Sequence, residues 1–138
     1  LDVAVEAAAL GSEQGFDLCG PNIGRRIRIS QEIARRGLDE ESFLREVYDV
    51  VGTGLPTVQT VPAVFAVVLY ANADPTICAK LAANLGGDTD TIGSISCGIA
   101  GAFSGVERFD RSLLEGVTRV NQLDMESVAK QLQAIYFS

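Results

Sequence analysis

Residues 86–93 read Gly-Gly-Asp-Thr-Asp-Thr-Ile-Gly, and an apolar segment continues from them to residue 105. The two glycines follow a helix-like stretch, and glycine readily adopts the left-handed conformation that ends a helix. Asp88 or Thr89 is then a favourable N-cap for a second helix. Along that helix, large apolar residues recur at about the 3.6-residue helical spacing, and small residues recur four apart on another face. The large set is Ile92, Ile95, Ile99, Phe103 and Val106, and the small set is Gly93, Cys97, Gly101 and Gly105. We therefore expect a buried central helix whose two faces pack against different helices.

The two carboxylates of this stretch admit two interpretations. One capping Asp gains roughly 0.5–2 kcal/mol from cap bonds and the helix dipole. A second ionised Asp at about 5 Å would be repelled by roughly 3 kcal/mol at an effective dielectric constant of about 20, and a bound cation would reverse that sign. Asp88, Asp90 and the Thr91 hydroxyl are hard oxygen ligands, which suit Mg²⁺, Mn²⁺ or Ca²⁺ rather than Zn²⁺. From these residues alone, metal binding and capping by solvated carboxylates both stay open.

Three other motifs compete for the same residues. An EF-hand loop is excluded because Ile92 and Ile99 occupy the positions that need Asp or Asn and Glu. A P-loop is excluded because no lysine lies between Lys80 and Lys130. The Asp-x-Asp signature of haloacid-dehalogenase-like phosphotransferases remains a runner-up, although it follows a buried strand and here a helix is expected.

Four segments together resemble a known family. They are residues 85–92 (LGGDTDTI) and 98–103 (GIAGAF), with 52–55 (GTGL) and 61–63 (VPA) upstream. These segments resemble the C-terminal motif of the ADP-ribosylglycohydrolase family, which includes the ADP-ribosyl-acceptor hydrolases and the dinitrogenase-reductase-activating glycohydrolases. The resemblance is specific from about residue 52 to residue 105 and looser towards the C-terminus. It implies an all-α fold, an orthogonal multi-helix bundle around a binuclear metal centre that usually holds Mg²⁺.

The resemblance also implies a reaction. The protein would be a hydrolase that cleaves the glycosidic bond from ADP-ribose to an arginine nitrogen, a serine oxygen or a related acceptor. Asp88, Asp90 and Thr91 would bind one side of a centre of two Mg²⁺ ions, with Mn²⁺ as an alternative. Such ions act as Lewis acids and activate water. The substrate would be an ADP-ribosylated protein or a small ADP-ribosyl compound.

Substrate-binding residues follow from the same resemblance. Thr53, Gly54 and Leu55 match a family segment that lies against the nucleotide end of the substrate, and Gly87 is also expected to contact the substrate. From composition alone, the 52–59 segment is equally well explained as a plain connector.

The chain is predicted to be the C-terminal half of one family domain, residues 1–138. It opens inside a helix-like pattern without an initiator Met, whereas the family places its first acidic cluster near the N-terminus of a longer domain. Catalytic groups, including a Glu that acts on water or the leaving group, are expected in that N-terminal half, which is then a required partner. The chain alone is expected to bind metal weakly and to be inactive. The alternative is a non-catalytic member of the fold that binds a nucleotide or a metal.

Composition excludes several partners. The net charge is −7, and an acidic domain is a poor candidate for nucleic acid or an anionic membrane. The chain contains no His, so general acids and bases would have to be carboxylates, water or groups from elsewhere. The three cysteines, Cys19, Cys78 and Cys97, form no Cys-x-x-Cys pair and suit a reducing cytoplasm. No apolar run is long enough to span a bilayer.

The remaining patterns predict an all-α chain of about eight helices without significant sheet. Helices are expected over 2–14 and 23–36, after caps at Asp39, Thr60, Asp74, Asp110 and Asp124, and over the central segment. Pro62 is expected in the first turn of the helix capped by Thr60. We expect the third helix to bury Phe43, Leu44, Val47, Tyr48 and Val51, and the fifth to bury Ile77, Cys78, Leu81 and Leu85. Five arginines between residues 25 and 36 are interpreted as a solvated basic face.

Overall fold

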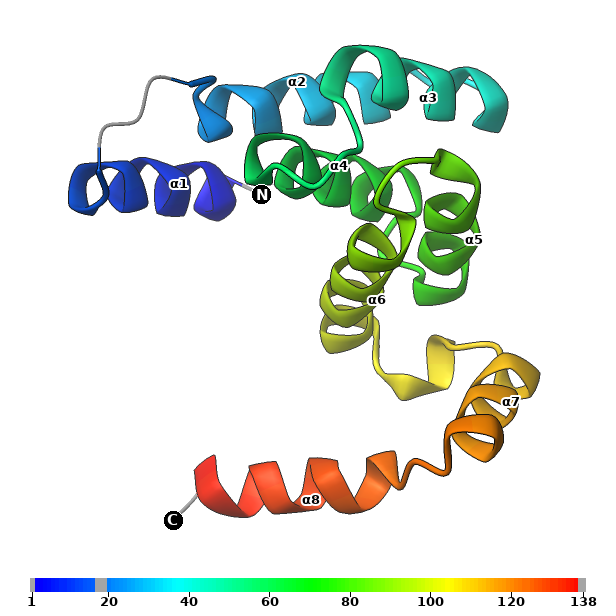
Figure 1. Cartoon of the computed structure of the whole chain (residues 1–138). Coiled ribbons are helices and arrows are strands. Elements are labelled where there is room, and N and C mark those ends of the chain that lie inside the picture. Colours follow the sequence, from blue (N-terminus) through cyan, green and yellow to red (C-terminus); the bar gives the residue numbers. More distant parts are fainter. Residues whose placement is uncertain (1, 17–19, 137–138) are drawn as a thin grey trace. The chain divides into compact units, whose positions relative to one another are not determined.

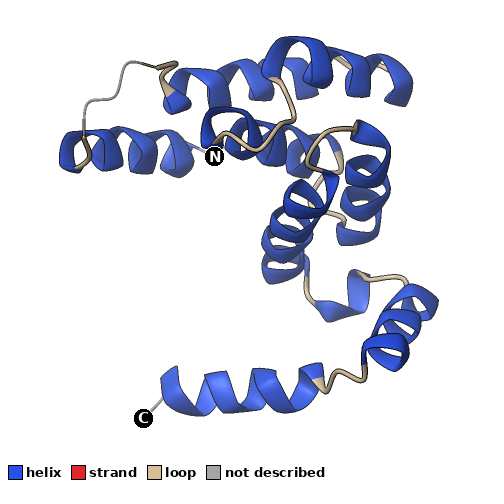
Figure 2. Ribbon diagram, viewed as in Figure 1, coloured by secondary structure: helices blue, strands red, loops and turns tan. Residues whose placement is uncertain are grey.

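The structure is a computed structural model that describes residues 2–16 and 20–136. Helices account for all regular structure in these two ranges, which confirms the predicted all-α fold (Figure 1, Figure 2). The α-helices are α1 (Asp2–Gln14), α2 (Ile23–Ala34), α3 (Glu40–Glu46), α4 (Thr57–Tyr70), α5 (Pro75–Leu85), α6 (Thr89–Ser104), α7 (Arg111–Asn121) and α8 (Met125–Tyr136). A π-helical segment, η1 (Val47–Val51), continues α3, and a short 3₁₀ turn, η2 (Val106–Arg108), follows α6. No described helix is long and apolar enough to cross a membrane.

The chain divides into two compact units, residues 1–108 and 109–138. In the first unit α2 packs on α4, and α4 and α5 both pack on α6 (Figure 1). Small residues permit the close approach of α5 and α6, because a Cβ atom added to Gly93 would lie 3.3 Å from the Cβ of Ala82. The core is aliphatic around one stacked pair, in which the rings of Phe43 and Tyr70 lie 3.9 Å apart.

Predicted helix starts are confirmed at three positions in the first unit. Asn22, Asp39 and Asp74 each accept a hydrogen bond from the backbone N–H three residues later, which satisfies one of the free donors at a helix start. Pro75 follows in the first turn of α5, where its missing N–H costs nothing.

The burial pattern of two helices differs from the prediction. Phe43, Val47 and Val51 are buried as expected, but Tyr48 is 52% exposed. Tyr48 follows the buried Val47 by one residue, which places it roughly a quarter of a turn away, on the flank of the helix. In α5, Ile77 is 42% exposed because the covered face runs along Cys78, Leu81 and Leu85.

Helix α4 starts earlier than predicted. It begins at Thr57 with Pro56 as N-cap residue, so Thr60 is not the cap and Pro62 lies beyond the first turn. The Thr60 hydroxyl instead donates to the carbonyl oxygen of Gly54 at 2.9 Å. The hydroxyl that was predicted to accept a bond at a helix start is therefore a donor to the preceding loop.

The prediction that both faces of the central helix are buried is wrong for the described structure. In α6 the fully buried positions are Ile92, Ser96 and Ala100, a line that faces α4 and α5. Along the bulky face, Ile99 is 37% and Phe103 83% exposed. These side chains line an apolar cavity of about 510 Å³ together with residues of α1 and α4. Periodicity locates an apolar face but does not say which neighbour covers it.

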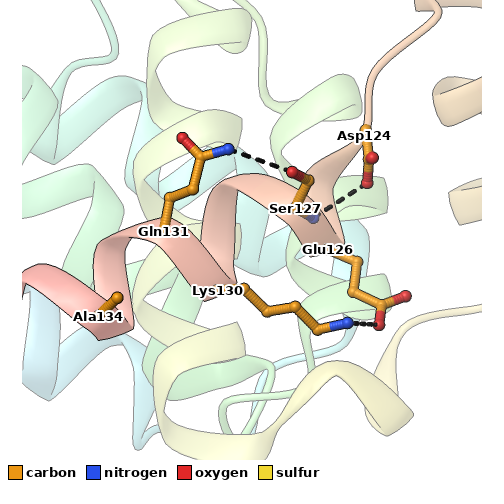
Figure 3. A pocket seen from close by; sticks show the side chains of 6 residues that line it. All are labelled: Asp124, Glu126, Ser127, Lys130, Gln131 and Ala134. Atoms are coloured by element: carbon orange, nitrogen blue, oxygen red, sulfur yellow. Dashed lines mark hydrogen bonds and ion pairs between the residues drawn. The ribbon is translucent and has the colours of Figure 1, made fainter.

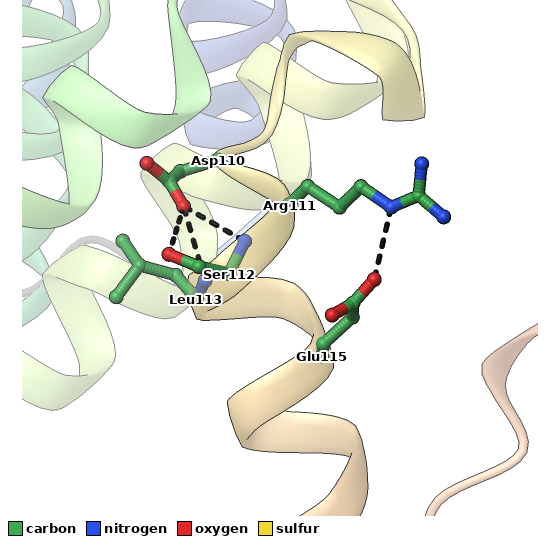
Figure 4. Close-up of polar contacts among 5 residues, drawn as sticks. All are labelled: Asp110, Arg111, Ser112, Leu113 and Glu115. Atoms are coloured by element: carbon green, nitrogen blue, oxygen red, sulfur yellow. Dashed lines mark hydrogen bonds and ion pairs between the residues drawn. The ribbon is translucent and has the colours of Figure 1, made fainter.

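The second unit consists of two capped amphipathic helices. Asp110 accepts from the N–H groups of Ser112 and Leu113 (Figure 4). Asp124 accepts from the N–H of Ser127 (Figure 3), so both predicted caps are confirmed. The apolar residues of both helices remain exposed, and they are Leu113, Val117, Val120, Val128, Leu132 and Ile135.

The thiols at the interface of α5 and α6 are free, as predicted. Burial raises the pKa of Cys78 to about 12, and the neighbouring Cys97 and Asp74 add to the shift. Burial also raises the pKa of Cys97, whose Sγ lies 3.5 Å from the Pro75 carbonyl oxygen. Both groups are therefore neutral at pH 7. Cys19 and part of the predicted 15–24 loop lie outside the described residues.

Candidate functional site

The double glycine before α6 makes a turn that contacts a distant loop. Gly86 and Gly87 both have positive φ angles, 80° and 74°, which side chains with a Cβ atom rarely adopt. A Cβ atom on Gly87 would lie 2.3 Å from the carbonyl oxygen of Thr53 and 2.4 Å from its hydroxyl. The Asp88 N–H donates to the same carbonyl oxygen at 2.7 Å. The structure thus brings together Thr53, Gly87 and Asp88, which the sequence singled out separately.

The loop that carries Thr53 is held by polar contacts at several points. The Gly54 N–H donates to Oε1 of Gln59 at 2.9 Å, and the Gly54 carbonyl accepts from Thr60. Thr53 is 3% exposed, whereas Leu55 is 81% exposed. The segment therefore has a backbone held by hydrogen bonds and an exposed Leu55 side chain.

Arg26 of α2 holds the ends of this loop. Its Nε donates to the Val58 carbonyl oxygen at 2.6 Å, and its Nη2 donates to the Val51 carbonyl oxygen. In an unbroken helix the Val58 carbonyl would accept from residue 62, but Pro62 has no N–H. Arg26 replaces that missing donor. This residue therefore does not belong to a solvated basic face, which corrects the sequence prediction for that arginine.

The carboxylates of the motif are not used for capping. Asp88 occupies the N-cap position of α6, but its side chain makes no cap hydrogen bond. Neither Asp88 nor Asp90 has a side-chain hydrogen bond or ion pair with the part of the chain that the structure describes. Asp88 is half-buried, while Asp90 and Thr91 are exposed in the first turn. The positive end of the helix dipole stabilises these charges, but the oxygens remain free to bind a ligand.

Asp88, Asp90 and Thr91 offer three oxygen-bearing side chains at the start of α6. Two unpartnered carboxylates and a hydroxyl are oxygen donors of the kind that Mg²⁺ and Mn²⁺ prefer. Across residues 2–16 and 20–136, no group of three or more His, Cys, Asp or Glu side chains is arranged to hold a metal ion. The role of Asp88, Asp90 and Thr91 as metal ligands therefore stays a prediction.

Sequence reasoning missed the residues that support the site. Gln59 and Arg26 bind backbone groups of the loop, and Tyr48 contacts Gly86. Pro62 inside a helical pattern indicated that such a residue was needed. A proline has no N–H, so the carbonyl four residues earlier needs another donor. Nothing in the sequence indicated which residue would supply it.

A separate cavity of about 470 Å³ lies along the start of α8 (Figure 3). Its lining comes from a single helix and its cap, and Lys130 pairs there with Glu126 at 2.6 Å. Because both side chains of this ion pair are more than two-thirds exposed, the cavity is a surface depression.

A model of the family described as ADP-ribosylglycohydrolase matches residues 1–136. The chain belongs to the ADP-ribosylglycohydrolase family. It is 42% identical over 111 residues to the protein of Escherichia coli K12 named "Uncharacterized protein YegU", a match that covers 80% of this chain. The matched region is 33% of YegU, so the chain spans about a third of the length of that relative. No solved structure matches the chain.

The fold and the family also exclude the haloacid-dehalogenase-like alternative for the Asp88-Thr89-Asp90 motif. The haloacid-dehalogenase-like interpretation needs a buried strand directly before Asp88, whereas α5 occupies residues 75–85 and the described chain has no strand. That interpretation is wrong. Family membership supports a glycohydrolase-type hydrolytic function in general.

Proposed function

We propose that this chain contributes to the metal-dependent hydrolysis of the bond that joins ADP-ribose to a protein side chain or a related acceptor. The observation that carries the proposal is the contact of two motifs at one turn. The Asp88 N–H binds the Thr53 carbonyl, so the acidic start of α6 and the 53–55 loop are adjacent. A site for this reaction needs metal ligands next to a substrate-binding backbone.

Each part of the turn has a proposed task. Asp88, Asp90 and Thr91 would hold Mg²⁺ or Mn²⁺ by their free oxygens, with two ions expected in the complete site. When bound, such ions supply Lewis-acid stabilisation of developing negative charge and activate water. The absence of a Cβ atom at Gly87 lets the backbone approach Thr53, and the exposed Leu55 offers apolar surface to the nucleotide end of the substrate.

The groups that move protons are proposed to come from another segment of the family domain. The chain has no His, and the described residues place no third metal-binding carboxylate, Cys or His with Asp88 and Asp90. A net charge of −7 supports a partner other than nucleic acid or an anionic membrane. The free thiols Cys78 and Cys97 support a cytoplasmic location.

The partial ligand set also favours a second candidate, a member of the fold that binds metal or nucleotide without turnover. The two candidates differ in one measurement. Release of ADP-ribose from a modified peptide requires the enzyme, whereas binding of the same peptide without release fits the binding module.

The test measures metal binding and turnover in the same set of variants. Calorimetric titration of the 138-residue chain with Mn²⁺ is expected to show weak binding, which Asp88→Asn or Asp90→Asn weakens further by more than the ~10–100-fold typical of outer-shell changes. Turnover is measured with an arginine-ADP-ribosylated peptide, Mg²⁺, and a chimaera in which this chain replaces the matching segment of YegU. Release of ADP-ribose is expected from the chimaera and is expected to stop with Asp90→Asn.

Asp49→Asn is the matched control, because Asp49 is exposed and lies outside the motif. It should leave both metal binding and turnover unchanged. Mn²⁺ affinity that is the same in the wild type, Asp88→Asn and Asp90→Asn would contradict the metal assignment. Turnover by the 138-residue chain alone would show that no other segment is needed.

A further inference from the structure

The second half of α6 lines the apolar cavity of about 510 Å³ that it shares with α1 and α4, which we call the α1–α4–α6 groove (Figure 1). Its lining includes Val3, Phe65, Leu69, Ile99 and Phe103. Among the described residues of this lining, Asn72 alone is polar and none is charged. Phe103 is 83% and Val3 75% exposed, so the groove presents large apolar side chains to solvent.

The apolar surface continues along α1. A second cavity, of about 460 Å³, shares Ala4, Ala7 and Phe65 with the groove, and its lining also includes Phe16, which is 97% exposed. No residue of α1 is fully buried in the described chain. Apolar surface that extends over three helices differs from the single exposed apolar residues that are normal on a protein, and it indicates an interaction surface.

The bulky face of α6 is covered along only part of its length. Ile92 is fully buried, whereas Ile99 and Phe103, about two and three turns later on the same face, are 37% and 83% exposed. No charged residue lies between Asp90 and Glu107, and a helix without a charged face is typical of a protein interior. The exposed half of this face therefore has the composition of a covered surface.

Three observations indicate what covers the groove. The match with YegU is 33% of that protein, so about two thirds of the relative lie outside the match. Permanent interfaces are rich in apolar residues, whereas transient ones are about as polar as the rest of the surface, so an uncharged groove favours a permanent neighbour. Two copies of a chain with net charge −7 repel each other, which disfavours a dimer.

A small-molecule ligand fits the groove less well than a helix. Ligand sites combine apolar walls with several placed polar groups, and Asn72 is the one polar residue among the described residues of this lining. Because all regular structure in the described chain is helical, the neighbour is expected to be a helix too. An apolar helix that lies in an apolar groove is a common mode of recognition.

We propose that an apolar helix from the part of the ADP-ribosylglycohydrolase domain outside these 138 residues docks in the α1–α4–α6 groove. The inference rests on the proposed function for the role of that part, which is to supply the groups that move protons, and it adds the surface that holds it. Phe103 lies about 22 Å from Asp88 along the axis of α6, at 1.5 Å per residue. One helix thus connects the docked segment to the metal motif.

The test compares the 138-residue chain with the chimaera in which it replaces the matching segment of YegU. In the chimaera, Phe103→Gln is expected to lower the melting temperature by at least about 4 °C, because it removes a covered ring and buries an amide. In the 138-residue chain the same variant should shift it by less than about 2 °C, since the ring is 83% exposed. Ile29→Gln is the matched control, because Ile29 lies on α2, is 39% exposed and does not line the groove. It should shift the melting temperature of both proteins by less than about 2 °C.

A second variant serves if Phe103→Gln prevents the chimaera from folding. The chain has no tryptophan, so Phe103→Trp adds one fluorescent reporter that keeps an aromatic ring in the groove. Iodide is expected to quench the new indole several-fold more strongly in the 138-residue chain than in the chimaera. In the chimaera the indole signal is taken as the difference from the protein without the substitution.

The outcomes separate this inference from the proposal beneath it. Equal shifts from Phe103→Gln in both proteins, equal quenching of the indole, or an unsubstituted chimaera that does not fold would each overturn the docking surface. Self-association of the 138-residue chain that Phe103→Gln abolishes would also overturn it, because the occupant would then be a second copy. A chimaera that shows the expected shift and quenching but releases no ADP-ribose would support the docking surface and contradict the proposed function.

Discussion

Helices α4–α6 and helices α7–α8 are alike in sequence pattern and different in burial. Both regions have apolar residues at helical spacing, and a capping aspartate starts α5 as it starts α7 and α8. Yet Ile92 and Leu81 are at most 1% exposed, while Val117 and Leu132 are 55% and 63% exposed. The first region pairs its apolar face with small residues that let a neighbouring helix approach. The comparison teaches that a cap and an apolar stripe are local properties, whereas burial requires a matching surface.

The largest expected effect is a truncation that tests this contrast directly. Ile92→Ala should lower the free energy of unfolding by about 2–5 kcal/mol, because it opens a cavity beneath α6. Leu132→Ala, the same kind of change on α8, should alter it by less than about 0.5 kcal/mol. Urea unfolding measures both. Similar losses at the two positions would mean that α8 buries its stripe in solution and that the contrast is false.

A smaller effect is expected where α6 meets the Thr53 loop. Gly87→Ala should destabilise the protein by about 3 kcal/mol, because the new Cβ atom would collide with Thr53 and the φ angle is unfavourable. Gly98→Ala, within α6, is the control, since a Cβ atom there meets nothing within 4 Å. It should be neutral or stabilise by up to about 1 kcal/mol. A neutral Gly87→Ala variant in thermal unfolding would argue against the close contact.

Arg26→Met should cost about 2 kcal/mol. It leaves the carbonyl groups of Val51 and Val58 without their donor while it keeps most of the side-chain volume. Arg25→Met is the neighbouring control, because Arg25 is exposed and makes no side-chain bond with a described residue. Equal stability of the two variants would show that the loop does not depend on α2.

The smallest expected effect belongs to the second unit. Asp110→Ala removes the side-chain acceptor for the first N–H groups of α7 and should cost about 1 kcal/mol of helix stability (Figure 4). Hydrogen exchange at Ser112 and Leu113 should accelerate about fivefold, and Asp110→Asn should restore most of the protection. Unchanged exchange in the alanine variant would mean that α7 is stabilised by something other than its cap.

The sequence sufficed for features that depend on nearby residues. The caps at Asp39, Asp74 and Asp110 and the helical class were predictable, because each rests on hydrogen bonds or spacings within one or two turns. The exposure of Tyr48 could not be predicted, because it depends on which side of the helix is covered by neighbouring elements.

The candidate site also has a part that nearby residues specify and a part that depends on contacts between distant segments. Asp88, Asp90 and Thr91 were recognisable as a motif, and their role as metal ligands stays a prediction. The contact of Gly87 with Thr53 joins residues of separate elements, and the sequence indicated each end but not their meeting. The predicted start of α4 was wrong, because the Thr60 hydroxyl resembled a local cap but donates to the Gly54 carbonyl oxygen.

The replacement of a missing helical donor by Arg26 makes positions 26 and 62 depend on each other. Alanine at position 62 would return an N–H that competes for the Val58 carbonyl, and an apolar residue at position 26 would leave that carbonyl bare beside a proline. A lysine at 26 would place one ammonium group where two carbonyl groups need separate donors. We therefore expect the two positions to covary among related sequences, with arginine accompanying proline, although the residues lie on different helices.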